Sequence, residues 1–174
     1  SSGVGKHSLQ SLRLEPNGEQ LLLGVFDGAQ NGAVLWEYNG RIRAGVNLDS
    51  GEIANAVDYA RRALSPRNIR GLAAADLDGD GQPEIVIATS RKLLYLFDSD
   101  FKLRKCIPLG GEPTALAVRP GRIAVGRADG EVRLFDGNGQ AVAGFRAGAA
   151  VTALEFTEKG LLTGADGKLI EIAL

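Results

Sequence analysis

The residues best suited to chemistry in this sequence form one short acidic stretch, which runs from Asp76 to Glu84 and reads DLDGDGQPE. Asp76, Asp78 and Asp80 stand at alternate positions, and Glu84 follows four residues after the last of them. Carboxylates at this spacing, with glycines that let the chain turn tightly, can surround a hard cation from a single loop. Without a cation they would repel one another strongly. The stretch therefore predicts a metal-binding loop that is stabilised by its metal.

The residues on either side of this stretch predict that it joins two strands. An EF-hand loop would need a bidentate glutamate at its twelfth position, and the sequence has Ile87 there, which excludes the helix-loop-helix form of the site. Short apolar segments, Gly71 to Ala75 and Glu84 to Thr89, flank the loop instead. Their length and composition are typical of strands.

These two strands belong to a unit that recurs four times along the chain. Each copy has a short first strand rich in small residues, a second strand that ends in glycine or alanine, and a third strand that ends in an aromatic or large aliphatic residue. The leucines that mark the first strands are 60, 44 and 38 residues apart, and they are Leu12, Leu72, Leu116 and Leu154. The last two spacings suit a four-stranded propeller blade, of about 40 to 45 residues. A sandwich also has short strands at such spacing, but the likeness between copies favours an all-β fold, a β-propeller of about four blades.

The predicted domain organisation is a single propeller over residues 1–174, with blades at about 9–48, 69–110, 112–148 and 150–174. The longest spacing contains an insertion at about 49–66, which predicts an α-helix near residues 50–64. Asp49 would cap this helix, Glu52 would complete the cap, and Ile53, Val57, Ala60 and Leu64 would share one face. The helix would either pack on the propeller or dock a partner.

The fourth unit contains only three strands, because it reaches its third strand just before Leu174. Three arrangements follow: a closed four-bladed ring completed by the N-terminal segment, a larger ring assembled from two chains, or part of a longer propeller. Unpaired strand edges favour association. We therefore expect a homo-oligomer or part of a larger propeller assembly.

An acidic loop of this kind between two blade strands resembles the calcium loops of FG-GAP repeats, also called VCBS or integrin-α-like repeats. The resemblance implies Ca²⁺, with side-chain ligands from Asp76, Asp78, Asp80 and Glu84 and a backbone carbonyl ligand from Gln82. It also implies a secreted, periplasmic or cell-surface protein. A second stretch, GEVRLFD at 130–136, resembles the third strand of WD40 or quinoprotein-type blades.

Composition and the remaining reactive residues favour binding over catalysis. The formal net charge is only -1, so the basic surface of a nucleic-acid-binding protein is absent, and no apolar run is long enough to cross a bilayer. The only histidine, His7, lies in a segment with no predicted element, and the only cysteine, Cys106, lies in an apolar strand that favours a packed thiol. The preferred hypothesis is a non-catalytic, calcium-stabilised interaction module that binds a protein or glycan. The alternatives are the propeller portion of a carbohydrate-active enzyme such as a polysaccharide lyase, and a scaffold subunit of a larger complex.

Overall fold

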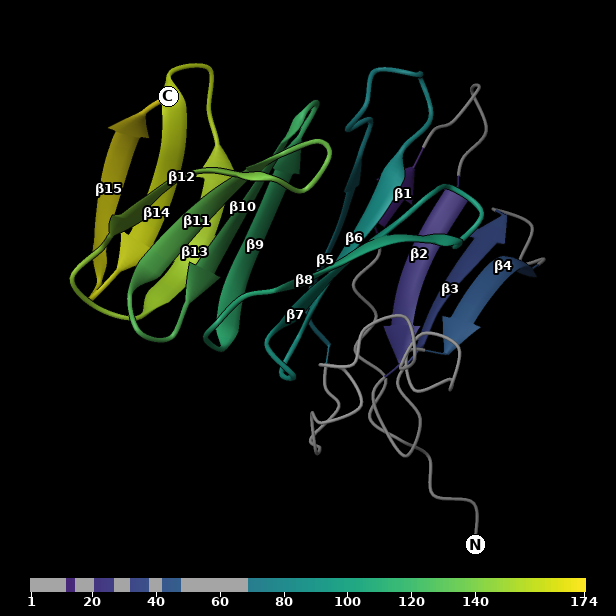
Figure 1. Ribbon diagram of the computed structural model, residues 1–174, viewed down its shortest axis with the longest axis horizontal. Coiled ribbons are helices and arrows are strands. Elements are labelled where there is room, and N and C mark those ends of the chain that lie inside the picture. The colour runs from purple at the N-terminus through teal and green to yellow at the C-terminus, as the bar shows by residue number, and fades with distance from the viewer. Residues whose placement is uncertain (1–11, 15–20, 27–31, 38–41, 48–68) are drawn as a thin grey trace, which may run out of the picture.

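The structure is a computed structural model that describes the backbone of residues 12–14, 21–26, 32–37 and 42–47 and all atoms of residues 69–174. Here the chain forms fifteen strands in four antiparallel sheets (Figure 1). The first sheet contains β1 (Leu12–Leu14), β2 (Leu21–Phe26), β3 (Gly32–Glu37) and β4 (Ile42–Asn47). The second contains β5 (Ile69–Ala75), β6 (Glu84–Thr89), β7 (Leu93–Phe97) and β8 (Leu103–Pro108). The third contains β9 (Pro113–Arg119), β10 (Arg122–Arg127), β11 (Glu131–Asp136) and β12 (Ala141–Arg146), and the fourth contains β13 (Val151–Phe156), β14 (Gly160–Ala165) and β15 (Lys168–Ala173).

Each sheet is a meander in which strands that follow one another in the sequence pair side by side. Tight turns make this possible, and the turn between β11 and β12 is an example. Gly139 has a φ of 71°, which a glycine adopts without steric cost. Its backbone N–H donates to the carbonyl of Asp136 over 2.9 Å, which closes the turn that Asn138-Gly139 predicts.

The sheets are joined through their first strands, as the blades of a propeller are. Strand β9 lies between β5 and β13, and β1 contacts β5. The Thr114 hydroxyl on β9 donates to the carbonyl of Val151 on β13 over 2.6 Å. Small residues such as Ala73, Ala115 and Ala117 occupy these crowded strands, as the sequence predicts. The all-β, propeller-like prediction is confirmed, whereas closure into a ring stays a prediction, because the first and fourth sheets lie at opposite ends of the series in Figure 1.

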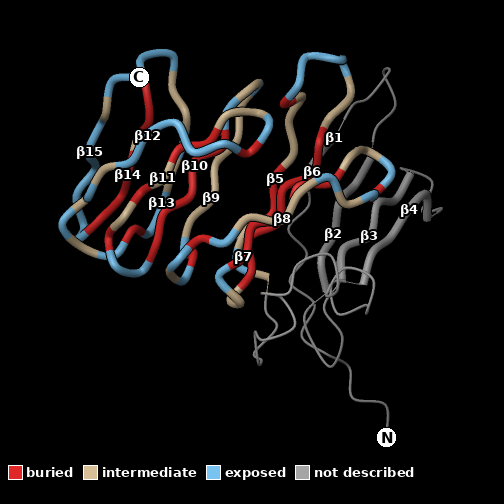
Figure 2. The backbone as a smooth tube through the Cα atoms, viewed as in Figure 1, coloured by how far each residue is buried: buried red, intermediate tan, exposed pale blue. Residues whose placement is uncertain are grey.

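Apolar side chains fill the space between neighbouring sheets, and Figure 2 shows the buried residues along the middle strands β6, β7, β10 and β14. One core joins the second and third sheets and includes Val86, Leu96, Ile123, Val125 and Phe135. Another joins the third and fourth sheets and includes Ala124, Val132, Leu134, Val151 and Leu161. Burial of each large aliphatic side chain contributes about 1.5–3 kcal/mol to folding. These cores fix the order of the sheets.

The described residues contain no helix, and so none that is long and apolar enough to cross a membrane. The helix that the sequence predicts near residues 50–64 lies within 48–68, outside the described residues.

Candidate metal-binding loop

The acidic stretch forms the connection between β5 and β6, as predicted. Ala75 at the end of β5 pairs with Glu84 at the start of β6. Gly79 and Gly81 both have a φ of 84°, in the left-handed region that favours glycine. The two glycines therefore let eight residues return the chain to the next strand, with the aspartates held on the loop.

The aspartate side chains shape the loop by accepting hydrogen bonds from its backbone. Asp76 accepts from the N–H of Gly79 over 2.6 Å through Oδ1 and from the N–H of Gly81 over 3.0 Å through Oδ2. Asp78 accepts from the N–H of Asp80, and Asp80 in turn accepts from the N–H of Gln82 over 2.8 Å. Such short-range bonds are the usual reason that aspartate stabilises turns.

Glu84 differs from the aspartates because it is only 2% exposed. Its Oε2 accepts a hydrogen bond of 2.7 Å from the backbone N–H of Leu77, a loop residue that is itself buried. Burial raises the pKa of the Glu84 carboxyl, although the Leu77 N–H acts in the opposite direction. Burying a carboxylate without a positively charged partner costs free energy, so a cation beside Glu84 would stabilise the loop.

Three of the predicted ligands converge and one does not. One carboxylate oxygen from each of Asp76, Asp78 and Glu84 lies within 4.8 Å of the others, close enough for one metal ion to contact all three. Asp80 is exposed, lies outside this group and accepts from the Gln82 N–H. The carbonyl role predicted for Gln82 stays a prediction.

A positive charge that does not belong to the acidic motif already lies beside these carboxylates. Nη1 of Arg104 on β8 is 2.8 Å from Oδ2 of Asp78 and 2.9 Å from Oε1 of Glu84. The hydrogen bond from Arg104 lowers the pKa of the Asp78 carboxyl. A four-stranded meander brings the start of its fourth strand to the same end as the turn between its first two strands, so the position of Arg104 could have been inferred.

The donor set fits a hard cation in kind, because it consists of carboxylate oxygens that converge on one point. Arg104 provides the positive charge for two of these carboxylates, Asp78 and Glu84. A divalent ion at the loop would therefore compete with the Arg104 guanidinium.

The loop also packs against the third sheet. The backbone N–H of Gly121 donates to the carbonyl of Asp76 over 3.2 Å. Gly137, in the turn after β11, lies so close to Leu77 that a Cβ atom at this position would be 1.8 Å from the Leu77 carbonyl oxygen. A cation that holds the loop in place would therefore also stabilise the packing of the second sheet against the third.

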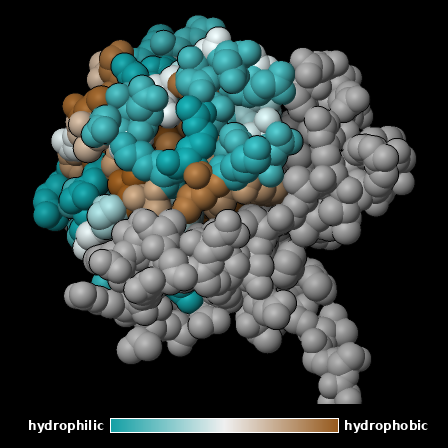
Figure 3. Space-filling view, turned by 45° about the vertical axis from the view of Figure 1, so that its right-hand side comes forward, coloured by the Kyte–Doolittle hydropathy of each residue, from teal (hydrophilic) through white to brown (hydrophobic). Residues whose placement is uncertain are grey.

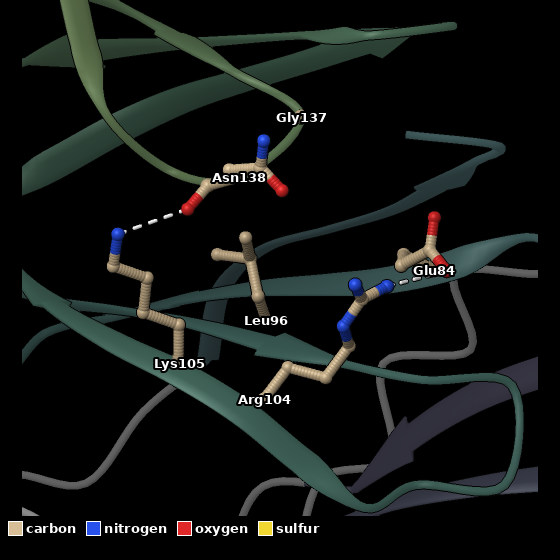
Figure 4. A pocket seen from close by; sticks show the side chains of 6 residues that line it. All are labelled: Glu84, Leu96, Arg104, Lys105, Gly137 and Asn138. Carbon is tan, nitrogen blue, oxygen red and sulfur yellow. Dashed lines mark hydrogen bonds and ion pairs between the residues drawn. The ribbon is translucent and has the colours of Figure 1, made fainter. Parts of the chain in front are cut away.

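A small pocket of about 160 Å³ lies beside the loop at the same boundary (Figure 4). Figure 4 shows Arg104 directed at Glu84 on one side and Lys105 directed at the Asn138 turn on the other, with Leu96 between them. Nζ of Lys105 donates to the Asn138 carbonyl over 2.9 Å. The lining contains no aromatic side chain on which a sugar ring could stack; it consists of Glu84, Leu96, Arg104, Lys105, Gly137 and Asn138.

Of the two residues considered for nucleophilic or acid–base chemistry, the structure describes only one. His7 lies outside the described residues. Cys106 lies on β8, where burial raises the pKa of its thiol to about 12. A thiol with such a pKa is protonated at neutral pH and is a poor nucleophile, as the packed-thiol prediction requires.

The described surface offers few apolar side chains outside the sheet cores. Figure 3 shows mostly hydrophilic residues over the described part of that face, with apolar atoms in limited areas. Within the described residues, the exposed large hydrophobic side chains are Val142 on β12 and three in or just after β15, namely Leu169, Ile170 and Leu174.

Comparison with known proteins identifies the fold but not the family. No protein-family model matches the sequence, and no curated protein matches it. Among solved structures, BBS1N in complex with ARL6DN is 13% identical with a TM-score of 0.67, over 94% of this chain and 51% of that chain. Sqt1 of Saccharomyces cerevisiae is 14% identical with a TM-score of 0.66, over 89% of this chain and 44% of that chain. The computationally designed Ika4 protein is 15% identical with a TM-score of 0.66, over 99% of this chain and 95% of that chain.

These similarities establish an all-β, propeller-like fold. The chain spans about half the length of the first two matched proteins.

Proposed function

We propose that this protein is a non-catalytic, calcium-stabilised β-propeller module that binds a protein partner. The observation that carries the proposal is the outer face of the fourth sheet, on which the described residues place no further sheet. The second and third sheets are each covered by the next sheet along the chain, whereas Leu169 on β15 of the fourth sheet is 70% exposed. The equivalent faces of the second and third sheets lie in sheet-to-sheet cores, which favours a packing role for this face in the fourth sheet.

The chemistry of this surface supports a protein partner more than a glycan. Its exposed apolar side chain, Leu169, is aliphatic, whereas Ile170 continues the Leu154–Thr163 row of the opposite face. Aliphatic side chains bury well against other protein side chains, whereas sugar recognition commonly uses aromatic stacking and convergent hydrogen bonds. Trp36 and Tyr38 are aromatic residues that could stack on a sugar ring; Tyr38 lies outside the described residues, and only the backbone of Trp36 is described.

Calcium would be held by Asp76, Asp78 and Glu84, together with Asp80 and the carbonyl of Gln82. The convergence of the first three carboxylates supports this assignment. The bound ion would neutralise the carboxylates and so hold the loop against the third sheet. A calcium loop of this kind suits a secreted, periplasmic or cell-surface protein, where free calcium is high enough for a weak site.

The calcium proposal is tested by thermal unfolding of the protein in calcium and in a chelator. We expect calcium to raise the Tm of the wild type, because a ligand that binds only the folded state stabilises it. Asp78→Ala should lower the Tm in calcium and abolish the response to calcium. Asp100→Ala is the matched control, because Asp100 is an exposed aspartate in a different turn. A calcium response that persists in Asp78→Ala would contradict the ligand assignment.

The partner-binding proposal is tested by photo-crosslinking from the fourth sheet. A benzophenone amino acid in place of Leu169 should crosslink the protein to a discrete partner in cells that produce it. The same group in place of Val142, which is 51% exposed on β12 of the third sheet, is the control and should not capture that partner. Equal capture from both positions, or none from position 169, would contradict the proposal.

A further inference from the structure

The outer face of the fourth sheet repeats a pattern that the other sheets use to receive their neighbours. In the third sheet, Ala115, Gly126 and Val132 are paired in register and form one row across β9, β10 and β11. The equivalent row in the second sheet has the same character, with small residues followed by an aliphatic one, and consists of Gly71, Ala88 and Leu94. We call such a row the receiving row of a sheet.

Contacts show that each receiving row accepts the following sheet closely. A Cβ atom at Gly126 would lie 2.3 Å from Cγ1 of Val151 and 3.3 Å from Cδ1 of Leu154, which are both in the fourth sheet. A Cβ atom at Gly71 would lie 2.8 Å from Cβ of Leu116, in the third sheet. The missing side chain is thus the space into which the next sheet packs.

The fourth sheet has a receiving row of the same composition with nothing packed on it in the described residues. Ala153, Gly164 and Leu169 are paired in register across β13, β14 and β15. The nearest atoms to a Cβ at Gly164 belong to Thr152 and Ala153 of the same sheet, at 3.2 Å or more. Leu169 is 70% exposed, whereas Val132 at the same place in the third sheet is fully buried.

The first sheet has at the matching register positions the residues that such a row accepts. The rows that pack on a preceding sheet start with leucine: Leu116 is in register with Val125 in the third sheet, and Leu154 with Thr163 in the fourth. In the first sheet, Leu12, Leu23 and Leu35 occupy the same register positions. The described residues place no sheet before this one, and the first and fourth sheets lie at opposite ends of the series (Figure 1).

We propose that the Ala153–Gly164–Leu169 row binds the first sheet of a second copy of this chain, so that the copies associate head to tail. The inference rests on the proposed function and names the partner. A contact between unlike faces of two copies closes into a ring when the rotation between copies permits it. The interface continues the same sheet-on-sheet packing that already joins the second, third and fourth sheets.

One pair of rows in this arrangement has like charges at corresponding positions, which opposes association. The row beside the receiving row of the fourth sheet contains Glu155, Leu162 and Glu171, which are paired in register. The corresponding row of the first sheet contains Leu14, Leu21 and Glu37. Head-to-tail association would bring Glu37 of one copy toward Glu171 of the next, and like charges weaken an interface. Removal of the Glu171 charge should therefore strengthen association between copies, whereas it would weaken the binding of a partner with basic residues there.

Sedimentation analysis of the purified protein over a wide concentration range tests the proposal. We expect the mass to rise from 18.3 kDa toward a multiple of that value. Leu169→Asp should weaken association about tenfold or more, because it puts a charge into the apolar centre of the interface. Glu171→Gln should strengthen association, and Val142→Asp on the third sheet should leave it unchanged. Leu169 is exposed in the single chain, so its replacement should not prevent folding, and a Tm measurement checks this.

A mass of 18.3 kDa at every concentration would overturn the second-copy proposal, as would association that Leu169→Asp leaves intact or Glu171→Gln weakens. The more general proposal of a protein partner fails separately, when the crosslinker at position 169 captures no protein of any kind. A monomer that crosslinks to another protein would therefore contradict only the head-to-tail contact.

Discussion

The outer faces of the third and fourth sheets carry the same row of residue types, but one face is buried and the other is exposed. Val132 of the third sheet is fully buried beneath the fourth sheet, whereas Leu169 at the equivalent position is 70% exposed. A Cβ atom at Gly126 would meet Val151 of the fourth sheet, whereas the nearest described atoms to a Cβ at Gly164 belong to its own sheet. The residue types of one sheet therefore prepare a surface for packing, and this surface becomes a core where another sheet packs on it.

The largest difference between the two faces is expected when the two glycine positions are filled. Gly126→Val should destabilise the protein by about 3 kcal/mol or prevent folding, because the new side chain would overlap Val151. Gly164→Val should cost less than about 1 kcal/mol in the single chain, because the described residues place no second sheet over it.

Urea denaturation of both variants, at concentrations too low for association, measures this difference. Equal destabilisation would show that the fourth sheet itself requires glycine at position 164. It would then contradict the claim that Gly164 leaves room for the sheet of another copy.

A smaller effect is expected at the charged boundary between the second and third sheets. Arg104→Gln leaves Asp78 and Glu84 without their guanidinium partner, so in a chelator the Tm should fall by a few degrees. In calcium the same variant should bind the ion more tightly than the wild type, because its competitor is gone. Calorimetric titration measures the affinity, and Arg146→Gln is the control, because it removes an exposed arginine that pairs with Glu131, at the opposite end of β11 from Gly137. Unchanged calcium affinity in Arg104→Gln would contradict competition.

Acid denaturation tests how the stability of this boundary depends on pH. Arg104 lowers the pKa of Asp78 below its usual 3.8, so the pair stabilises the fold fully above that pH and loses its contribution as the pH falls through the lowered pKa. Burial of Glu84 acts in the opposite direction, because a raised pKa favours the fold at lower pH. Arg104→Gln should therefore lose less stability than the wild type on acidification below pH 3.8.

The smallest effect is expected at Cys106, which is partly exposed. Because burial raises the pKa of its thiol to about 12, the folded protein should react slowly with iodoacetamide at pH 8, and urea should restore a normal rate. Rapid modification of the folded protein would show that the thiol is not held in the apolar surroundings of β8.

The sequence predicts local features well, because short stretches determine them. The alternation of short apolar strands with Asn138-Gly139-type turns predicts the meanders. The spacing of the acidic stretch predicts four converging carboxylates, of which three converge and Asp80 does not. The contacts that depend on two sheets at once were not predicted. Arg104 meets the loop only because β8 returns to its end of the sheet, and Gly137 touches Leu77 only because the third sheet packs beside it.

The most direct test of the central claim is to measure whether the outer face of the fourth sheet is covered in solution. Ala153→Cys places a small reporter thiol on this face, and native Cys106 contributes little background at pH 8 because its pKa is raised to about 12. We predict that the labelling rate of the new thiol falls as the protein concentration rises, because copies cover one another. A labelling rate that stays high and constant at every concentration would contradict head-to-tail association through this face.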